Sequence, residues 1–465
     1  MPAVVRPVSV RLWFLPIRTR VPLKFGPETL DTVTLARVSM TVRDDHGNEA
    51  VGWGETPLSV QWVWPSPLPF QTRQHALMDF TRRLVAAWAD WPVMAHPLVS
   101  GARFQTEAML PLQREFNRER PEPEHLPYLA ALVCTSPFDL ALHDALGNLL
   151  HRNSFHCYSR DHVGSDLAAM LEPAADAPGV SFADLAPDRF LNPEPPAELP
   201  VWHLVGGLDP LESTDLAGDE PDDGFPVLLE DWIRTDGLTC LKVKLRGTDH
   251  DWDLERLRRI AALARPLGVT DLSADFNCTV TDPAYVSSIM DVIERHDPWL
   301  WQHLLYIEQP FPYDLESHSI DVHAIARRKP LFLDESAHDW QHVRLGRQLG
   351  WNGVALKTCK TLTGALLSLC WARAHGMPLM VQDLTNPMLA IIPHVRLAAH
   401  ADTIRGVECN AMQFYPQASA PEEAVLPGLY RRRRGRLDLS GLGAHGLGQG
   451  PAVTARQLPD PDCRS

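Results

Sequence analysis

Two lysines, Lys242 and Lys244, stand two positions apart at the end of the apolar run 239–244. In a β-strand, residues i and i+2 point to the same side, so both ammonium groups would project into the same space. Their mutual repulsion and their partial burial both lower a lysine pKa toward the range in which the amine acts as a base. A lysine pair on a solvated strand end is the alternative, so base chemistry requires other residues that hold an acidic substrate.

Acidic side chains close three later apolar runs, and a lysine closes the next one. The steps from Lys244 through Asp275, Glu308 and Asp334 to Lys357 are 31, 33, 26 and 23 residues, each long enough for one strand and one helix. Three carboxylates gathered at one point repel one another unless a cation lies among them. Oxygen ligands without histidine favour Mg²⁺ over zinc or iron. We therefore predict that Asp275, Glu308 and Asp334 bind Mg²⁺.

Four further polar residues follow the ends of these runs, namely Asn277, Glu335, Asp383 and Glu408. We interpret them as groups that orient the metal ligands or contact the substrate, with a purely structural role as the alternative. Lys360 stands three residues beyond Lys357, and we expect its side chain to be solvated.

Residues 200–408 predict the elements that would position these side chains. Short apolar runs alternate with amphipathic segments, which is typical of parallel strands joined by crossover helices. Eight such strands predict a closed parallel barrel, whose functional groups gather at the carboxyl ends of the strands. The predicted strands are 201–205, 239–244, 270–275, 304–308, 330–334, 353–357, 378–382 and 403–408, and the predicted helices are 252–267, 283–296, 315–328, 339–349, 363–376 and 387–400. A doubly wound open sheet is the alternative, but no glycine-rich phosphate turn follows a strand.

In an eight-stranded barrel the second and sixth strands face each other, so Lys244 and Lys357 would contact a substrate from opposite sides. Mg²⁺ would hold the substrate carboxylate and stabilise the enediolate that forms when a lysine removes the α-proton. Two lysines on opposite faces allow the proton to leave from one face and return to the other. Lys242 would then lower the pKa of Lys244.

The residues on either side of the barrel predict a second, α+β domain. Segments 7–15 and 32–43 alternate like strands, with a turn at 44–48. Segments 72–89 and 137–150 have helical spacing, with Ser136 as the cap of the second helix. We predict this domain at 1–150, an irregular connecting excursion at 151–199, the barrel at 200–415, and a segment at 416–465 that returns to the N-terminal sheet.

Composition excludes several classes of protein. The net charge of -15 opposes binding to nucleic acid over most of the surface. We find neither a signal peptide nor a run of ~20 apolar residues, and so expect a cytoplasmic protein that does not bind membranes. The eight cysteines show no CxxC spacing, which argues against a disulfide framework or a zinc site.

The motifs named above resemble those of the enolase superfamily, in its branch of muconate-lactonizing enzymes, succinylbenzoate synthases and dipeptide epimerases. The matching stretches are LKVK at 241–244, ADFN at 274–277, YIEQP at 306–310, LDES at 333–336 and VALK at 354–357, with GWGE at 52–55 and ALHD at 141–144. The resemblance implies a modified (β/α)8 barrel, of (β/α)7β type, with an α+β capping domain built from both ends of the chain. It also implies that loops at 21–30 and 56–65 close over the substrate and that the protein is a homo-oligomer. A lysine or histidine base beside Mg²⁺ is an established pattern of that superfamily.

At two places the residues of this chain differ from the motifs of particular branches of the superfamily, which argues against those branches. The mandelate-racemase branch ends its sixth strand in Asp and its seventh in His, where this chain has Lys357 and Gln382-Asp383. Dipeptide epimerases carry paired aspartates at the eighth strand, where this chain has Glu408-Cys-Asn410. This difference argues against a dipeptide substrate, and Glu408 would instead hydrogen-bond the enediolate oxygen.

The predicted function is Mg²⁺-dependent removal of the α-proton of a small-molecule carboxylate by a racemase or epimerase. A cycloisomerase or a syn-eliminating lyase is the close alternative, because the same two lysines serve all three reactions. A non-catalytic barrel protein is the alternative from another class. Trp53, Trp62 and Trp64 suggest an apolar substrate body, although they suit the core of a small domain equally well.

Overall fold

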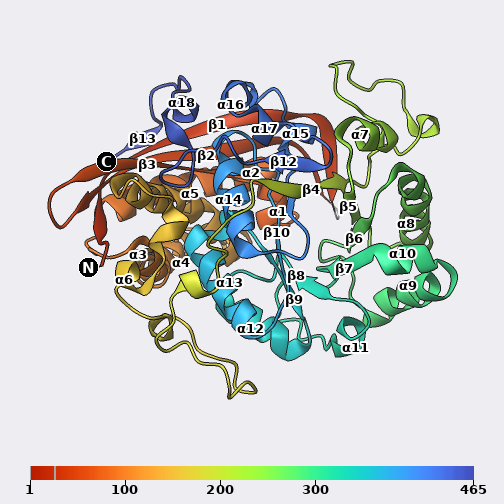
Figure 1. Cartoon of the computed structure of the whole chain (residues 1–465), viewed down its shortest axis with the longest axis horizontal. Helices are drawn as coiled ribbons and strands as arrows, with labels where there is room; N and C mark the ends of the chain where they lie inside the picture. The colour runs from red at the N-terminus through yellow and green to blue at the C-terminus, as the bar shows by residue number, and fades with distance from the viewer. Residues whose placement is uncertain (1, 26–27) are drawn as a thin grey trace.

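Two sheets organise the chain in the computed structural model, which describes residues 2–25 and 28–465. One is an antiparallel sheet of order β13-β1-β2-β3, and the other has the order β10-β9-β8-β7-β6-β5-β4-β11, with β12 paired to β4. The long strands β1 (Val5–Phe25), β2 (Glu28–Asp44) and β3 (Glu49–Pro57) run across the upper part of Figure 1, beside the barrel. Both ends of the chain lie at the same side of the molecule.

The second sheet is parallel along β4 to β11 and curves into a barrel, because β11 at one end pairs with β4. Its strands are β4 (Glu198–Val205), β5 (Cys240–Lys244), β6 (Asp271–Asp275), β7 (Leu304–Glu308), β8 (Leu331–Leu333), β9 (Gly353–Leu356), β10 (Leu379–Val381) and β11 (Val407–Glu408). Large side chains from β4, β7 and β8, namely Trp202, Tyr306 and Phe332, pack together inside it. The predicted barrel with a second α+β domain is confirmed.

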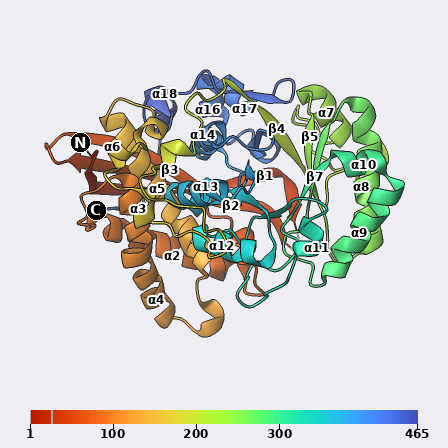
Figure 2. The ribbon, with the colours of Figure 1, turned by 60° about the horizontal axis from the view of Figure 1, so that its bottom comes forward.

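Helices cover the outside of the barrel, as Figure 2 shows for α8, α9 and α10 on the side away from the antiparallel sheet. They are α7 (Leu229–Asp236), α8 (His250–Ala264), α9 (Pro283–His296), α10 (Pro298–His303), α12 (Trp340–Leu349), α13 (Leu362–Ala374) and α14 (Ile391–Ala401). The prediction of a helix at 315–328 is wrong for most of its length, because within it the structure has only the short helix α11 (His323–Ala326). Asp314 accepts hydrogen bonds from the backbone and side chain of Ser317, a local turn that competes with a helix here.

Close packing of a helix on β3 explains the glycines of the GWGE stretch. The second domain contains α2 (Phe70–Ala89), α3 (Pro97–Phe104), α4 (Leu110–Arg118) and α5 (Tyr128–Leu149). A Cβ atom at Gly52 would lie 2.1 Å from the carbonyl oxygen of Ala141, and one at Gly54 would lie 2.0 Å from that of Pro137. Only glycine therefore lets the backbone of α5 approach the strand this closely.

The prediction that a helix begins at Pro137 is wrong, because α5 begins at Tyr128 and contains Pro137 in its interior. An interior proline costs about 3 kcal/mol. All residues from 129 to 147 are buried, and burial of each large apolar side chain contributes about 1.5–3 kcal/mol, which outweighs that cost. Among the residues described, the stretch Glu122–Leu149 is long and apolar enough to cross a membrane, but its apolar window lies wholly inside the protein.

The segment after the barrel returns to the antiparallel sheet. It contains α16 (Ala420–Val425), α17 (Pro427–Tyr430), β12 (Arg436–Asp438), α18 (Gly450–Thr454) and β13 (Cys463–Arg464). Strand β13 pairs antiparallel with β1, with Arg464 opposite Arg11 and Cys463 opposite Leu12. The antiparallel sheet is therefore built from both ends of the described chain.

A buried ionic network joins these parts. Arg37 on β2 pairs with Glu55 on β3 and lies 3.6 Å from Glu422 on α16, which also accepts a hydrogen bond of 2.9 Å from Arg456. The other oxygen of Glu55 accepts the backbone N–H of Ala390, next to α14 of the barrel. Burial raises the pKa of Glu55, and the charge of Arg37 opposes that rise. Arg37 therefore neutralises the buried Glu55 and shares the buried Glu422 with Arg456.

We expect Arg37→Met to lower the free energy of unfolding by about 3–5 kcal/mol, because it leaves the buried carboxylate of Glu55 without its cation, while Glu422 keeps Arg456. Calorimetric and urea unfolding would measure the change. Arg43→Met is the matched control, since Arg43 pairs with Glu49 on the same two strands but the two side chains are 41% and 43% exposed. That exposed pair contributes less than about 1 kcal/mol, so equal losses in the two variants would contradict the assignment.

Candidate active site

The three predicted metal ligands come from neighbouring strands of the barrel. Asp275 ends β6 and Glu308 ends β7, and the two residues lie directly opposite each other in the parallel register. Asp334 follows β8. All three side chains are buried. The structure thus places three carboxylates at the carboxyl ends of consecutive strands, where a parallel barrel presents its functional groups.

Lys242 and Lys244 project from β5 into this group of carboxylates, and both are buried. The Nζ atom of Lys242 lies 2.6 Å from Glu308 Oε1, 3.1 Å from Glu408 Oε2 and 3.1 Å from Asp275 Oδ2. Lys244 donates to the same oxygen of Asp275. Burial lowers the pKa of Lys242, but Glu308, Glu408 and Asp275 outweigh it, so the pKa lies well above its ordinary value. The prediction that crowding lowers the lysine pKa is therefore wrong for Lys242, because carboxylates intervene.

Lys357 faces this cluster from the far side of the barrel. It follows β9, and its Nζ atom lies 3.2 Å from Asp334 Oδ2 and 2.9 Å from the carbonyl oxygen of Asp383. Burial lowers the pKa of Lys357, but the charge of Asp334 and of other nearby carboxylates raises it by more, so the pKa lies above its ordinary value. Strands β6, β7 and β8 lie between β5 and β9 on one side of the ring, and β10, β11 and β4 on the other.

The prediction that Lys360 is solvated is wrong. Its side chain is 2% exposed, donates to the carbonyl oxygens of Asp334 and Ala337, and lies 3.5 Å from Asp334 Oδ1. A 3-10 turn at Thr358–Lys360 follows β9, and a turn of three residues brings positions 357 and 360 to the same side. Lys360 therefore holds the segment that carries Asp334.

Lys244 and Lys357 line one cavity of about 40 Å³, together with Lys242, Asp334 and Glu408. Residues of the antiparallel domain cover this cavity. Leu23, Phe25, Leu30 and Ser59 line it, as does Trp62 on the short helix α1 (Val60–Val63). The predicted closing loops at 21–30 and 56–65 thus reach the cavity, apart from positions 26 and 27, which lie outside the described residues.

The four further polar residues all contact the cluster. Asn277 donates its backbone N–H to Asp275 and its side-chain amide to Glu335 Oε1, at 2.9 and 3.0 Å. Burial, with Asp334 and Asp275, raises the pKa of Glu335 to about 7. Asn410 donates to Asp383 and to Glu408, over 3.1 and 2.7 Å.

Sequence reasoning passed over Gln382 and gave Asn410 no role. Gln382 donates to Glu308 Oε2 at 2.5 Å and accepts from Lys242 at 3.1 Å, so it fixes both partners of the buried ion pair. Gln382 could have been predicted from its position at the end of the predicted strand 378–382. It was passed over because the prediction of site residues relied on charged side chains.

The donor set has the chemistry that a divalent cation requires, because it consists of carboxylate oxygens. Oδ1 of Asp334 is buried and has no hydrogen-bond partner. Burial, with Asp275 and Asp334 beside it, raises the pKa of Glu308 well above its ordinary value. Within residues 2–25 and 28–465, however, no three His, Cys, Asp or Glu side chains are arranged around one point as the ligands of an ion. The carboxylates contact lysines instead, and those contacts would be exchanged on binding an ion.

The comparisons with known proteins agree with this architecture. Residues 226–452 match the family model described as enolase C-terminal domain-like. A dipeptide epimerase from Enterococcus faecalis, complexed with Mg and a dipeptide, is 15% identical over 95% of this chain and 99% of its own, with a TM-score of 0.61. An N-succinyl Arg/Lys racemase from Bacillus cereus is 15% identical over 99% of both chains, with a TM-score of 0.60. No curated protein sequence is significantly similar to this chain.

A muconate lactonizing enzyme from Pseudomonas fluorescens, complexed with muconolactone, is 15% identical over 95% of this chain and 96% of its own, with a TM-score of 0.58. At these identities the solved structures establish the fold alone. The family match and the shared two-domain fold confirm what the motifs predicted. Residues 226–452 form an enolase C-terminal domain-like domain, as the resemblance of the motifs to the enolase superfamily predicted.

Proposed function

We propose that this protein is an enzyme that removes the α-proton of a small-molecule carboxylate and racemises or epimerises that carbon. The observation that carries the proposal is the placement of Lys244 and Lys357 in one cavity, on strands from opposite sides of the barrel. A substrate between them presents one face of its α-carbon to each amine. One lysine then accepts the proton from one face while the other donates a proton to the opposite face.

Mg²⁺ is the cofactor that we assign to Asp275, Glu308 and Asp334. The oxygen donors, the buried Asp334 Oδ1, which accepts no hydrogen bond, and the raised pKa of Glu308 all support a divalent cation there. When bound, Mg²⁺ would hold the substrate carboxylate and stabilise the negative charge that develops as the α-proton leaves. The Enterococcus faecalis dipeptide epimerase, which shares the fold, is complexed with Mg.

The remaining buried residues position this machinery. Lys242 and Gln382 bind Glu308 from two sides and fix its orientation. Lys360 fixes the backbone at Asp334, and Asn277 orients Asp275. Trp62 lines the cavity with an apolar ring, which limits the water that could compete for the transferred proton.

Incubation in D₂O tests the function. Purified protein with Mg²⁺ and a panel of chiral carboxylates, including N-acylamino acids, is expected to introduce deuterium at the α-carbon and to invert its configuration. Mass spectrometry of the recovered substrate measures the exchange, and chiral chromatography measures the inversion. Deuterium uptake without inversion, for every substrate that exchanges, would contradict a racemase.

A cycloisomerase or syn-eliminating lyase is the second candidate. The ammonium of Lys357 lies 5.2 Å from the centre of the Trp62 ring, a position that favours a lysine retained as a cation. In that case Lys244 alone would act as the base, with Lys357 as an electrostatic partner. Elimination would give a product of different mass, and cycloisomerisation a product of equal mass but a different NMR spectrum.

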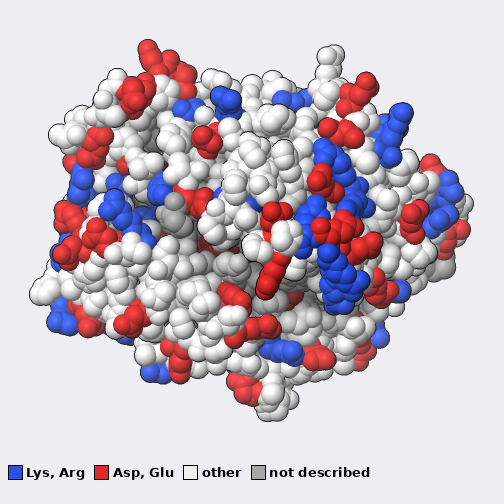
Figure 3. All heavy atoms as spheres, turned by 180° about the vertical axis from the view of Figure 1, so that it is seen from behind, with Lys and Arg blue, Asp and Glu red and all other residues white. Residues whose placement is uncertain are grey.

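We also propose that the protein acts in the cytoplasm and on small molecules alone. All eight cysteines are free, which suits a reducing compartment. Acidic and basic side chains are interspersed on the face shown in Figure 3, and the net charge of -15 opposes binding to a polyanion. A homo-oligomer is proposed from the family resemblance alone.

A further inference from the structure

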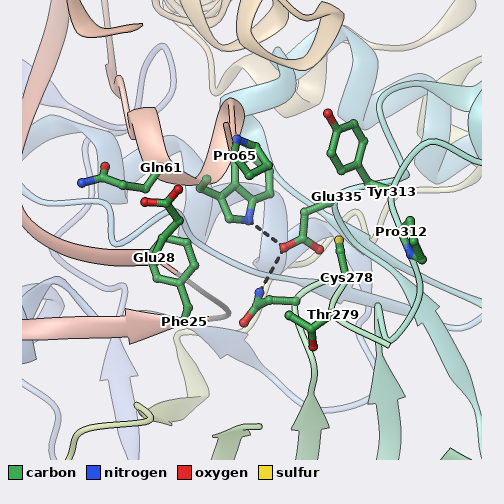
Figure 4. Close-up of a pocket in the computed structure, with 11 residues that line it drawn as sticks. Phe25, Glu28, Gln61, Pro65, Cys278, Thr279, Pro312, Tyr313 and Glu335 are labelled. Atoms are coloured by element: carbon green, nitrogen blue, oxygen red, sulfur yellow. Dashed lines mark hydrogen bonds between the residues drawn. The ribbon is translucent and has the colours of Figure 1, made fainter. Parts of the chain in front are cut away.

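A second cavity, of about 230 Å³, adjoins the one that contains the lysines. Phe25 and Trp62 line both cavities, so the two spaces meet at these rings. The second cavity is the larger, and Figure 4 shows Pro65, Pro312 and Tyr313 around it. The body of a substrate held between Lys244 and Lys357 would therefore extend into this space.

Three residues that line the second cavity each have one buried oxygen atom that accepts no hydrogen bond. They are Oε2 of Glu335, Oδ1 of Asn277 and Oε1 of Gln61, and the three side chains are 4%, 9% and 5% exposed. Their other polar atoms are used, because Glu335 Oε1 accepts from Trp62 and Asn277, both at 3.0 Å, and Gln61 Nε2 donates to the carbonyl oxygen of Thr29. A buried acceptor without a donor costs about 1–3 kcal/mol. These oxygens therefore suit a ligand that donates hydrogen bonds.

The charged side chains that line the second cavity are all acidic. Glu28 and Glu335 are its charged residues, and no Lys, Arg or His stands among the described residues that line it. Glu28 pairs with Arg73 at 3.5 Å, and Arg73 also donates to the carbonyl oxygen of Trp64. The rings of Phe25, Trp62 and Tyr313 add aromatic faces, which attract cations.

The adjoining cavities therefore differ in charge. Lys242, Lys244 and Lys357 line the first beside Asp334, Asp383 and Glu408, and these amines suit the carboxylate end of a substrate, whereas the charged side chains that line the second are carboxylates alone. Resting on the proposed function, we propose that the substrate is a carboxylate that also carries a cationic, hydrogen-bond-donating group, an amine or a guanidinium. Glu335, Asn277 and Glu28 bind that group in the second cavity. They are specificity residues, distinct from the residues that move the proton.

Two probes of nearly equal shape test the charge preference directly: N-acetyl-L-arginine, which carries a guanidinium, and N-acetyl-L-citrulline, which carries a neutral ureido group. Calorimetric binding in the presence of Mg²⁺ is expected to be at least about tenfold tighter for the arginine derivative. The ratio should fall below about twofold in Glu28→Gln and in Glu335→Gln. Glu119→Gln is the control, because Glu119 is an exposed carboxylate remote from both cavities, and it should keep the full ratio.

The outcomes separate this inference from the proposed function. Equal binding of the two probes by the wild type, or failure of the arginine derivative to bind, would overturn the cationic site, as would an unchanged ratio in both variants. Deuterium exchange is followed on the same samples. A charge preference in binding without any exchange would contradict the proposed function and support the cationic site. Deuterium exchange with neutral N-acylamino acids, without any charge preference in binding, would support the proposed function and contradict the cationic site.

Discussion

Lys244→Ala is expected to lose α-proton exchange on one face of the substrate by about 10²–10⁴-fold, while exchange on the other face continues. Lys357→Ala is expected to show the opposite facial selectivity. The reason is geometric, since the two amines reach the cavity from β5 and β9, with three strands between them on either side. Each amine can then reach a single face of the α-carbon.

Separate incubation of the two enantiomers of a substrate in D₂O measures this effect, because each enantiomer presents its α-proton to one lysine. Lys329→Ala is a suitable control, since Lys329 donates to the carbonyl oxygen of Trp301 on α10, outside the cavity. It should leave both exchange rates unchanged. Equal loss for both enantiomers in Lys244→Ala, with the fold intact by circular dichroism, would assign a single base and favour the lyase or cycloisomerase.

Glu308→Gln is expected to weaken Mg²⁺ binding by about 100-fold or more, as judged from the 10–100-fold losses found when residues around metal ligands are changed. Glu308 ends β7, which lies between the strands that carry Asp275 and Asp334. It is therefore the central one of the three carboxylates that would attract the ion. Calorimetric titration of Mg²⁺ in the absence of substrate measures the affinity without relying on turnover.

Glu408→Gln is the matched control for this titration. Glu408 contacts Lys242 at 3.1 Å, much as Glu308 does, but it comes from β11 and is not assigned as a ligand. We expect it to change Mg²⁺ affinity by less than about tenfold. Equal affinities of the wild type and Glu308→Gln would refute the assigned ligand.

The barrel and the location of the charged cluster were predictable because both depend on local patterns. A buried parallel strand is a short apolar run, and the residue that ends it faces the mouth of the barrel. Asp275, Glu308 and Lys357 could therefore be placed from their phase in the chain. Their roles in catalysis stay predictions, which the variants above test.

Contacts between distant segments could not be predicted in this way. The burial of Lys360 depends on a turn that follows β9, and the contact of Trp62 with Glu335 joins residues 273 positions apart. The interior position of Pro137 depends on the core around α5, whose burial outweighs the local preference of proline for a helix start. Tertiary packing decided each of these cases.

The pairing of β13 with β1 has a consequence for the order of folding. The backbone N–H of Phe14 donates to Asp462, and the indole of Trp13 donates to the carbonyl oxygen of Pro459. During synthesis β1 emerges first, and these partners become available only after the whole barrel has left the ribosome. Until then β1 has an open edge, which is prone to pair with strands of other molecules. Contacts this distant in sequence also slow folding, so a nascent chain of this protein would depend on protection of that edge.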